Sequence, residues 1–378
     1  MKNKLSFKVD MRAYTLILAL LLIFIVFTIM TNGDFISSRN LTNLSRQMTV
    51  IGVLAVGMTL IIVAGHIDLS VGSLLGLTGG IAAILQVWYG WSTIPVIIVT
   101  ILAGVVLGLW QGWWVAYKGV PAFIVTLGGM MIFRGILLGI SGGQTVAPMN
   151  DSFRAIGQAF IPYAVGYGLL AAAIVLGFIM AFRKRQRRET QGLGLGSPVI
   201  DYGTVAIFAI LATAFVYMLS RYHGIPVPLL ILLVVAGIFI FISKNTTFGR
   251  HIYAIGGNKE AARLSGINIK RNVLYVFVLM GALSAVAGII LTSRLNAGTV
   301  GAGNMYELDA IAAVVIGGTS LMGGVGTIVG SILGALIMAS IDNGMSMMNV
   351  APFWQYIVKG LILILAVYLD ISSKKKNA

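Results

Sequence analysis

Apolar runs separated by short polar segments repeat along the whole chain of 378 residues. A run of about twenty apolar residues is long enough to cross the ~30 Å hydrocarbon core of a bilayer as a helix. By this criterion we predict membrane spans over residues 11–31, 48–64, 69–88, 94–117, 121–140, 162–182, 202–219, 227–242, 273–292, 308–322, 325–341 and 353–369. The pattern therefore predicts an all-α fold, a polytopic transmembrane helical bundle of about twelve crossings.

Composition excludes a water-soluble protein. Hydrophobic residues make up 58% of the chain and charged residues only 10%, whereas soluble domains carry roughly 25% charged residues. The net charge of +15 comes from short basic clusters between apolar runs rather than from a contiguous basic domain, which argues against nucleic acid as a partner. Because the chain contains no cysteine, thiolate metal sites are excluded, and we predict no metal site.

Basic residues fall mainly on one side of the predicted spans. Clusters near the N-terminus, at residues 183–188, within 244–271 and at 374–376 share that side. Cytoplasmic loops of membrane proteins carry such an excess of Lys and Arg. We therefore expect both termini to be cytoplasmic, in a multi-pass protein embedded in a lipid bilayer.

Residues 65–72 (GHIDLSVG) place polar side chains between two long apolar runs. A charged side chain at membrane depth costs a few kcal/mol, so intramembrane acids usually line a bundle interior or a solute path. Asp68, Ser70 and His66 are therefore candidate residues of a substrate path. The simpler alternative is that Asp68 caps a helix beginning at Leu69, since Asp is a preferred N-cap residue. His66 fits a polar turn better than a proton relay, because no second intramembrane acid can be paired with it from the sequence.

A second interruption, residues 316–324 (IGGTSLMGG), lies in the other half of the chain. Unpaired backbone and hydroxyl groups at membrane depth are tolerated only where protein or a watery cavity satisfies them. A pair of glycine-interrupted segments, one in each half, is a typical pointer to the path of a transporter. We therefore add Thr319 and Ser320 to the candidate path. The alternative is that this cluster is only a tight hairpin turn.

Residues 248–271 form the longest patterned polar segment, on the basic and hence cytoplasmic side. Asn258 can cap a short helix that runs through Leu264, with Glu260 in its first turn and Gly266 as its terminator. A helix of two turns is too short to be stable in water without a partner. The segment is either a docking element for another protein or an ordinary solvated basic loop.

Three motifs together resemble the membrane permeases of bacterial monosaccharide ABC importers, the ribose, galactose and xylose branch related to the branched-chain amino-acid permeases. They are residues 65–72, 253–267 (YAIGGNKEAARLSGI) and 306–326 (YELDAIAAVVIGGTSLMGGVG), in family order, and the resemblance covers nearly the whole chain. It implies a type II ABC importer permease, a single transmembrane domain over residues 1–378 with a ten-helix core. It also implies a permease homodimer around a central sugar path, located in the bacterial inner membrane.

The resemblance implies two further partners. An extracytoplasmic sugar-binding protein would deliver the sugar, and a two-domain ATP-binding subunit would grip the cytoplasmic coupling loop, residues 248–271. The loop residues implied in this contact are Gly256, Asn258, Glu260, Ala261, Ala262, Ser265 and Gly266. The chain has no Gly-x-x-x-x-Gly-Lys-[Ser/Thr] phosphate loop. We therefore expect no enzymatic activity and no cofactor in this chain, with ATP and Mg bound by the partner ATPase.

The chain differs from a ten-helix core by an inserted helix pair around residues 182–201. This insertion carries five basic residues between positions 183 and 188 and the glycine-rich stretch 192–196. Its composition predicts a mobile basic linker, which either contacts anionic lipid or only sets the inside orientation. A longer chain with a basic central insertion is most similar to the xylose-type permeases, so we expect the pentose xylose as substrate.

Other functions stay open at this point. The same machine could carry galactose, ribose or a branched-chain amino acid. A proton-coupled secondary carrier would need ionisable pairs in the membrane. Besides Asp68, the sequence offers only isolated candidates for such pairs, at Arg134, Asp309, Asp342 and Lys359. A membrane-embedded docking protein without transport activity is the third possibility.

Overall fold

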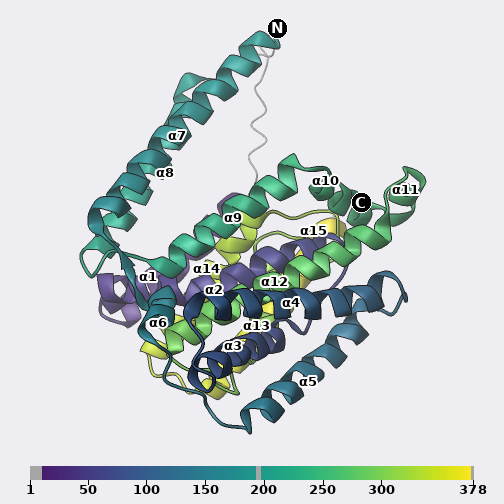
Figure 1. The fold of residues 1–378 in the computed structure, drawn as a ribbon. Helices are drawn as coiled ribbons and strands as arrows, with labels where there is room; N and C mark the ends of the chain where they lie inside the picture. The colour runs from purple at the N-terminus through teal and green to yellow at the C-terminus, as the bar shows by residue number, and fades with distance from the viewer. Residues whose placement is uncertain (1–10, 193–196, 376–378) are drawn as a thin grey trace.

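Most residues of the computed structural model, which describes residues 11–192 and 197–375, lie in helices (Figure 1). In chain order the helices are α1 (Met11–Met30), η1 (Asp34–Ile36), α2 (Ser38–Val63), α3 (Val71–Val87), α4 (Thr93–Ala116), α5 (Ala122–Ser141), α6 (Asp151–Gln158), α7 (Tyr163–Thr190), α8 (Pro198–Ser220), α9 (Val227–Asn245), α10 (Thr247–Gly257), α11 (Lys259–Leu264), α12 (Ile269–Leu295), α13 (Tyr306–Ile316), α14 (Ile328–Met347) and α15 (Pro352–Lys375). Two short strands, β1 (Phe160–Ile161) and β2 (Ile225–Pro226), pair antiparallel.

The described helices agree with the predicted number of spans. Nine are long and apolar enough to cross a membrane, and α1 and α3 provide shorter apolar helices. A further crossing is composite, because residues 296–305 run without a helix along α3 and then continue into α13. Gly298 packs against Ala83 near one end of α3, and Gly303 packs against Gly72 near the other end. Together these segments supply the about twelve crossings expected from apolar length.

The predicted span over residues 308–322 is wrong as a continuous helix. Helix α13 has only 11 residues, about 16 Å at 1.5 Å per residue, which is half of a bilayer core. Before it, Asn296 and Met305 adopt left-handed conformations with φ of 57° and 64°, and a helix cannot propagate through such residues. Counting apolar residues does not detect this interruption.

Helices α2 and α12 form the core of the bundle. In the most apolar 18-residue stretch of α2, 89% of the residues are buried, against 22% in the corresponding stretches of α4 and α5. Glycines bring α12 against α4, since a Cβ at Gly281 would overlap the Gly104 carbonyl oxygen and a Cβ at Gly104 would overlap the Gly281 carbonyl oxygen. Close backbone approach of this kind holds helices together in lipid, where apolar burial alone gives little driving force.

Helices α7 and α8 form a hairpin that stands apart from the rest of the bundle (Figure 1). In the most apolar stretch of each of these two helices, only 6% of the residues are buried. The pairing of β1 with β2 closes the base of the hairpin. The prediction that residues 183–188 belong to a mobile linker is wrong, because α7 continues through them. Lys184 and Arg185 form ion pairs with Asp201 of α8 at 3.7 and 3.2 Å. Residues 193–196 of the predicted linker lie outside the described residues.

The ends of the helices define two faces. At the first, which we call the α11 face, the turns between α2 and α3 and between α4 and α5 lie beside α11. His66, Lys118 and Lys259 from these three places line one groove of 530 Å³. Because successive crossings alternate in direction, the start of α2 and the end of α14 lie at the opposite face, where Asn40 donates to Asn343 Oδ1 (2.8 Å).

Candidate functional site

The short helix predicted in the coupling loop is confirmed as α11. Asn258 caps it, with Oδ1 accepting from the Ala261 N–H (2.9 Å). Gly266 follows its end with a left-handed φ of 80°. Glu260 and Arg263 pair on its surface, and the hydrogen bond to Glu260 raises the pKa of the Arg263 guanidinium. Local sequence was sufficient for this prediction, because each contact joins near neighbours in the chain.

Helix α11 presents most of the residues implied in a contact with an ATP-binding partner. Among these residues, Ala262 is buried and Gly256 is partly buried, and the exposed ones are Asn258, Glu260, Ala261, Ser265 and Gly266. The side chain of Leu264 is 77% exposed. A single exposed leucine is ordinary on a protein surface. On a helix of two turns, however, it belongs to a face that a partner would stabilise.

Helix α10, which precedes α11, was not predicted. Thr246 caps it, with its hydroxyl oxygen accepting from the Gly249 N–H (3.1 Å). Ile252 and Ile255 are buried at the spacing of one helical face. The signal was present in the sequence, as a threonine cap followed by apolar residues three apart. The longer polar pattern around Asn258 obscured it.

Gly256, near the end of α10, is the place where the coupling loop meets both interrupted segments. A Cβ at Gly256 would overlap the Val63 carbonyl oxygen and would lie 2.5 Å from the Gly324 nitrogen. The Gly324 N–H donates to the same Val63 oxygen (2.9 Å). Val63 is the last residue of α2, immediately before the first segment, and Gly324 belongs to the second. Helix α10 therefore contacts the two candidate path segments at a single point, which we call the Gly256 junction.

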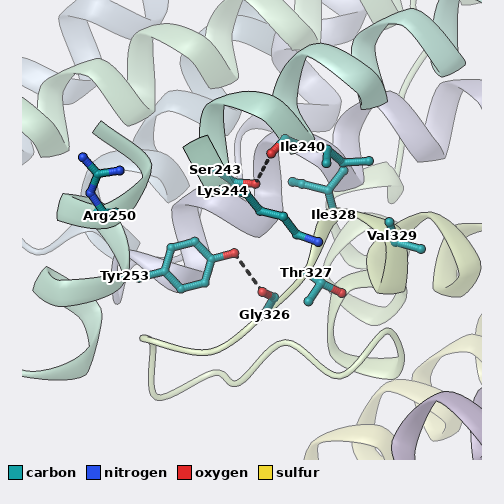
Figure 2. Close-up of a pocket in the computed structure, with 9 residues that line it drawn as sticks. All are labelled: Ile240, Ser243, Lys244, Arg250, Tyr253, Gly326, Thr327, Ile328 and Val329. Carbon is teal, nitrogen blue, oxygen red and sulfur yellow. Dashed lines mark hydrogen bonds between the residues drawn. The ribbon is translucent and has the colours of Figure 1, made fainter. Parts of the chain in front are cut away.

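Figure 2 shows the other side of this junction, a groove of 390 Å³ between α9, α10 and the start of α14. Tyr253 of α10 reaches across it, and its hydroxyl donates to the Gly326 carbonyl oxygen (2.8 Å). Lys244 and Arg250 line the same groove. Because a hydrogen bond and a backbone contact both join α10 to the segment before α14, a displacement of α10 would move that segment directly.

Asp68 is fully buried and organises the first interrupted segment rather than capping a helix. Its Oδ1 accepts from the Ser70 N–H (2.8 Å) and from the Ser70 hydroxyl (2.6 Å). The predicted helix start at Leu69 is wrong, since α3 begins at Val71 and its N-cap makes no side-chain capping bond. Gln111 of α4 donates from Nε2 to Ser70 Oγ (2.8 Å). The carboxylate and the hydroxyl thus tie the turn to α4.

His66 lies in the turn beyond the end of α2, outside the membrane-spanning helices. It is partly buried and lines the groove that also contains Lys259 of α11. Burial, with the Lys259 ammonium as the second cause, lowers the pKa of His66 to about 4. The imidazole is therefore neutral at physiological pH, as a polar turn residue would be.

The second interrupted segment is a compact turn between α13 and α14. The Ser320 N–H donates to the Val325 carbonyl oxygen (2.9 Å), and the Gly323 N–H donates back to the Ser320 oxygen (3.0 Å). Thr319 and Ser320 are both buried. The geometry of residues 316–324 therefore agrees with the alternative that this cluster is a tight hairpin turn.

Each candidate path segment joins the end of one helix to the start of the next, and both lie next to the Gly256 junction. The first segment also reaches into the bundle, because Ser70 is bound by Gln111 within α4 and Gly72 packs against Gly303 ahead of α13. Two buried polar atoms in the two segments, Asp68 Oδ2 and Thr319 Oγ1, have no hydrogen-bond partner in the described part of the chain. Buried polar groups are rarely left unpaired in proteins, so such atoms are expected to meet water or a solute.

The intramembrane ionisable residues are not isolated, contrary to the prediction. Lys359 of α15 contacts Asp309 of α13 and Asp342 of α14, with Nζ to Oδ2 distances of 2.9 and 2.8 Å. Arg134 donates from Nη1 to the backbone carbonyl oxygens of residues 300 and 302 (2.6 and 3.0 Å). The sequence shows three charges in apolar helices but not their proximity, because tertiary packing brings α13, α14 and α15 together.

Comparison with known proteins gives a consistent set of relatives. Residues 40–367 match the family model of the branched-chain amino acid transport system permease component. The chain is 50% identical over 370 residues to the xylose transport system permease protein of Escherichia coli, covering 97% of this chain and 94% of that protein. It is 49% identical over 370 residues to the protein of the same name from Haemophilus influenzae (97% and 98% covered). The ribose import permease protein of Haemophilus influenzae is 37% identical over 376 residues (98% and 97% covered). No solved structure matches the chain.

Proposed function

The chain belongs to the family of branched-chain amino acid transport system permease components, and from this premise we propose that it is the membrane permease subunit of an ATP-driven xylose importer. It is a multi-pass membrane protein and not itself an enzyme. Two xylose permeases share about half of its residues over nearly the full length, whereas the ribose permease shares fewer. This difference supports xylose ahead of ribose, galactose or a branched-chain amino acid.

The proposed mechanism is based on the contacts at the Gly256 junction. A separate ATP-binding subunit, which holds ATP and Mg, would dock on α11, which follows α10 at the cytoplasmic face. Because α10 contacts Val63 and Gly324 through backbone atoms, a force applied there is transmitted without a flexible side chain in between. The turns on either side of the junction would then open and close together.

We place the cytoplasmic end of the sugar path at four residues, Asp68, Ser70, Thr319 and Ser320. Asp68 fixes the Ser70 hydroxyl, and Thr319 Oγ1 is a buried hydroxyl oxygen without a partner in the described residues. Neutral hydroxyl groups can donate and accept weakly, which suits a sugar that must also leave. His66 borders this region from the groove at the α11 face.

The proposal includes a second copy of the permease, a lipid bilayer around the pair and a sugar-binding protein at the outer face. Apolar side chains on α4, α5 and α15 are widely exposed in the single chain, among them Ile98, Ile132 and Ile364. Exposed apolar surface of this extent is typical of membrane or protein contact. The α11 face carries the basic groove residues Lys118, Lys259 and Lys270, which supports a cytoplasmic position for it.

A charge reversal on α11 tests the docking role. Glu260→Lys breaks the pair with Arg263 and places a cation at the centre of the proposed interface. Substitution of a hot-spot residue near the centre of an interface costs ~2 kcal/mol or more, about thirtyfold in affinity. We expect the variant to insert in the membrane normally, to lose co-purification with the ATP-binding subunit and to lose xylose uptake.

The matched control is Glu189→Lys, which reverses an exposed glutamate at the end of α7, away from the loop. It should retain partner binding and uptake. Wild-type partner binding by the Glu260 variant would refute the docking role. Substrate choice is tested separately, by competition of ribose, galactose and branched-chain amino acids against xylose uptake.

A further inference from the structure

A polar cavity lies at the face opposite α11, away from both candidate path segments. Its volume is 210 Å³, below the about 300–1,000 Å³ of drug-sized ligand sites, and so suits a solute of about ten non-hydrogen atoms. Side chains from α2, α12, α13, α14 and α15 surround it. The polar ones are Gln47, Arg294, Tyr306, Asp342, Ser346 and Gln355.

Most of these polar groups are not used by the fold. In the described residues, the hydroxyls of Tyr306 and Ser346 make no hydrogen bond. Gln47 uses only its carbonyl oxygen, which accepts from Asn343 Nδ2 (3.4 Å). Gln355 donates to a backbone oxygen (2.9 Å), which leaves its own carbonyl oxygen available. Hydroxyl and amide groups that both donate and accept match the hydroxyl groups of a sugar.

The charges around the cavity favour a neutral ligand. Arg294 contributes a guanidinium and Asp342 a carboxylate, so neither an anion nor a cation is selected. Asp342 is held by Lys359 (2.8 Å), which also contacts Asp309 (2.9 Å). Lys359 and Asp309 lie behind the cavity lining and are positioning residues, since they fix the carboxylate without lining the cavity themselves.

We propose that this cavity is a subsite for one monosaccharide ring, entered from the outer face of the membrane. The inference rests on the proposed function and adds a site to it. Helix α13 joins this subsite to the Gly256 junction, because Tyr306 is its first residue and the turn containing Gly324 follows its end. A sugar in the cavity and a partner on α11 would therefore act on opposite ends of one half-length helix.

The absence of cysteine from the chain allows a direct test. Ser346→Cys introduces a single thiol at an exposed position that lines the cavity. The full-length variant is reconstituted in vesicles with its ATP-binding subunit and binding protein, then labelled from outside with a membrane-impermeant maleimide. With D-xylose at about ten times its dissociation constant, we expect labelling to slow about tenfold.

Asn43→Cys is the matched control, since Asn43 is exposed at the same face but lies outside the cavity. Its labelling rate should not respond to D-xylose. A second measurement uses uptake kinetics. Tyr306→Phe and Gln355→Ala should each raise the KM for D-xylose about fivefold through the loss of one hydrogen bond, with Asn43→Ala unchanged.

Equal labelling rates of the Ser346 variant with and without D-xylose, in an importer that does take up D-xylose, would overturn the subsite. Unchanged KM values in both kinetic variants would also overturn it. A wild-type importer that takes up no D-xylose would overturn the proposed function instead. A failure of the subsite and a failure of the proposed function therefore give different results.

Discussion

Gly256 shows at the scale of one residue how the loop is joined to the bundle. A Cβ there would overlap the Val63 carbonyl oxygen and approach the Gly324 nitrogen, and backbone atoms cannot rotate away as a flexible side chain can. Overpacking of this kind typically costs about 1–3 kcal/mol. We therefore expect Gly256→Ala to lower the thermal stability of the purified chain and to reduce xylose uptake by more than tenfold.

The neighbouring Gly257 provides the control. A Cβ at Gly257 has no heavy atom within 4 Å, so Gly257→Ala should keep both the melting temperature and the uptake rate. Loss of uptake in the two variants alike would mean that the helix end tolerates no substitution, and the specific role of the Gly256 junction would be contradicted.

His66 gives a prediction about pH. Burial and the Lys259 ammonium lower its pKa to about 4, so the imidazole stays neutral across the physiological range. His66→Gln should therefore leave the pH profile of xylose uptake unchanged from about pH 6 to about pH 8. If wild-type uptake shows a step near pH 6.5 that the variant lacks, His66 takes part in proton movement and this interpretation is wrong.

At the scale of elements, the ion cluster of α13, α14 and α15 makes a stability prediction. Lys359→Met would leave the carboxylates of Asp309 and Asp342 buried together without a cation. Breaking a buried ion pair by removing one partner costs about 3–5 kcal/mol. We expect a clear drop in the temperature at which the detergent-solubilised chain aggregates. Addition of Asp309→Asn and Asp342→Asn should restore most of the loss, and an unchanged single variant would show that the cluster does not hold these helices.

The elements also show what the sequence can and cannot predict. Helix α11 was predictable because Asn258 and Gly266 act on adjacent residues. The extent of α7 was not, since its basic end is helical through ion pairs with Asp201 of another helix. The half-length of α13 was missed because apolar composition is the same in a whole and a half crossing. The Gly256 junction could not be found from periodicity, as its partners come from distant parts of the chain.

At the scale of the whole molecule, the proposal gives the chain a different task at each face. The α11 face carries the proposed docking helix, the Gly256 junction and His66, and the opposite face carries the polar cavity. Helices α2, α13 and α14 each reach from the cavity to the region of the junction. The glycine-packed pair of α4 and α12 gives a rigid support beside α2. Such an arrangement fits a permease whose energy source is another protein.

The central claim is that a separate ATPase drives xylose through this chain. The most direct measurement is uptake of labelled xylose into vesicles that contain the permease alone or together with its ATP-binding subunit and binding protein, with and without ATP. The account predicts uptake only when all three proteins and hydrolysable ATP are present. Uptake by the permease alone, driven by a proton gradient without nucleotide, would contradict it.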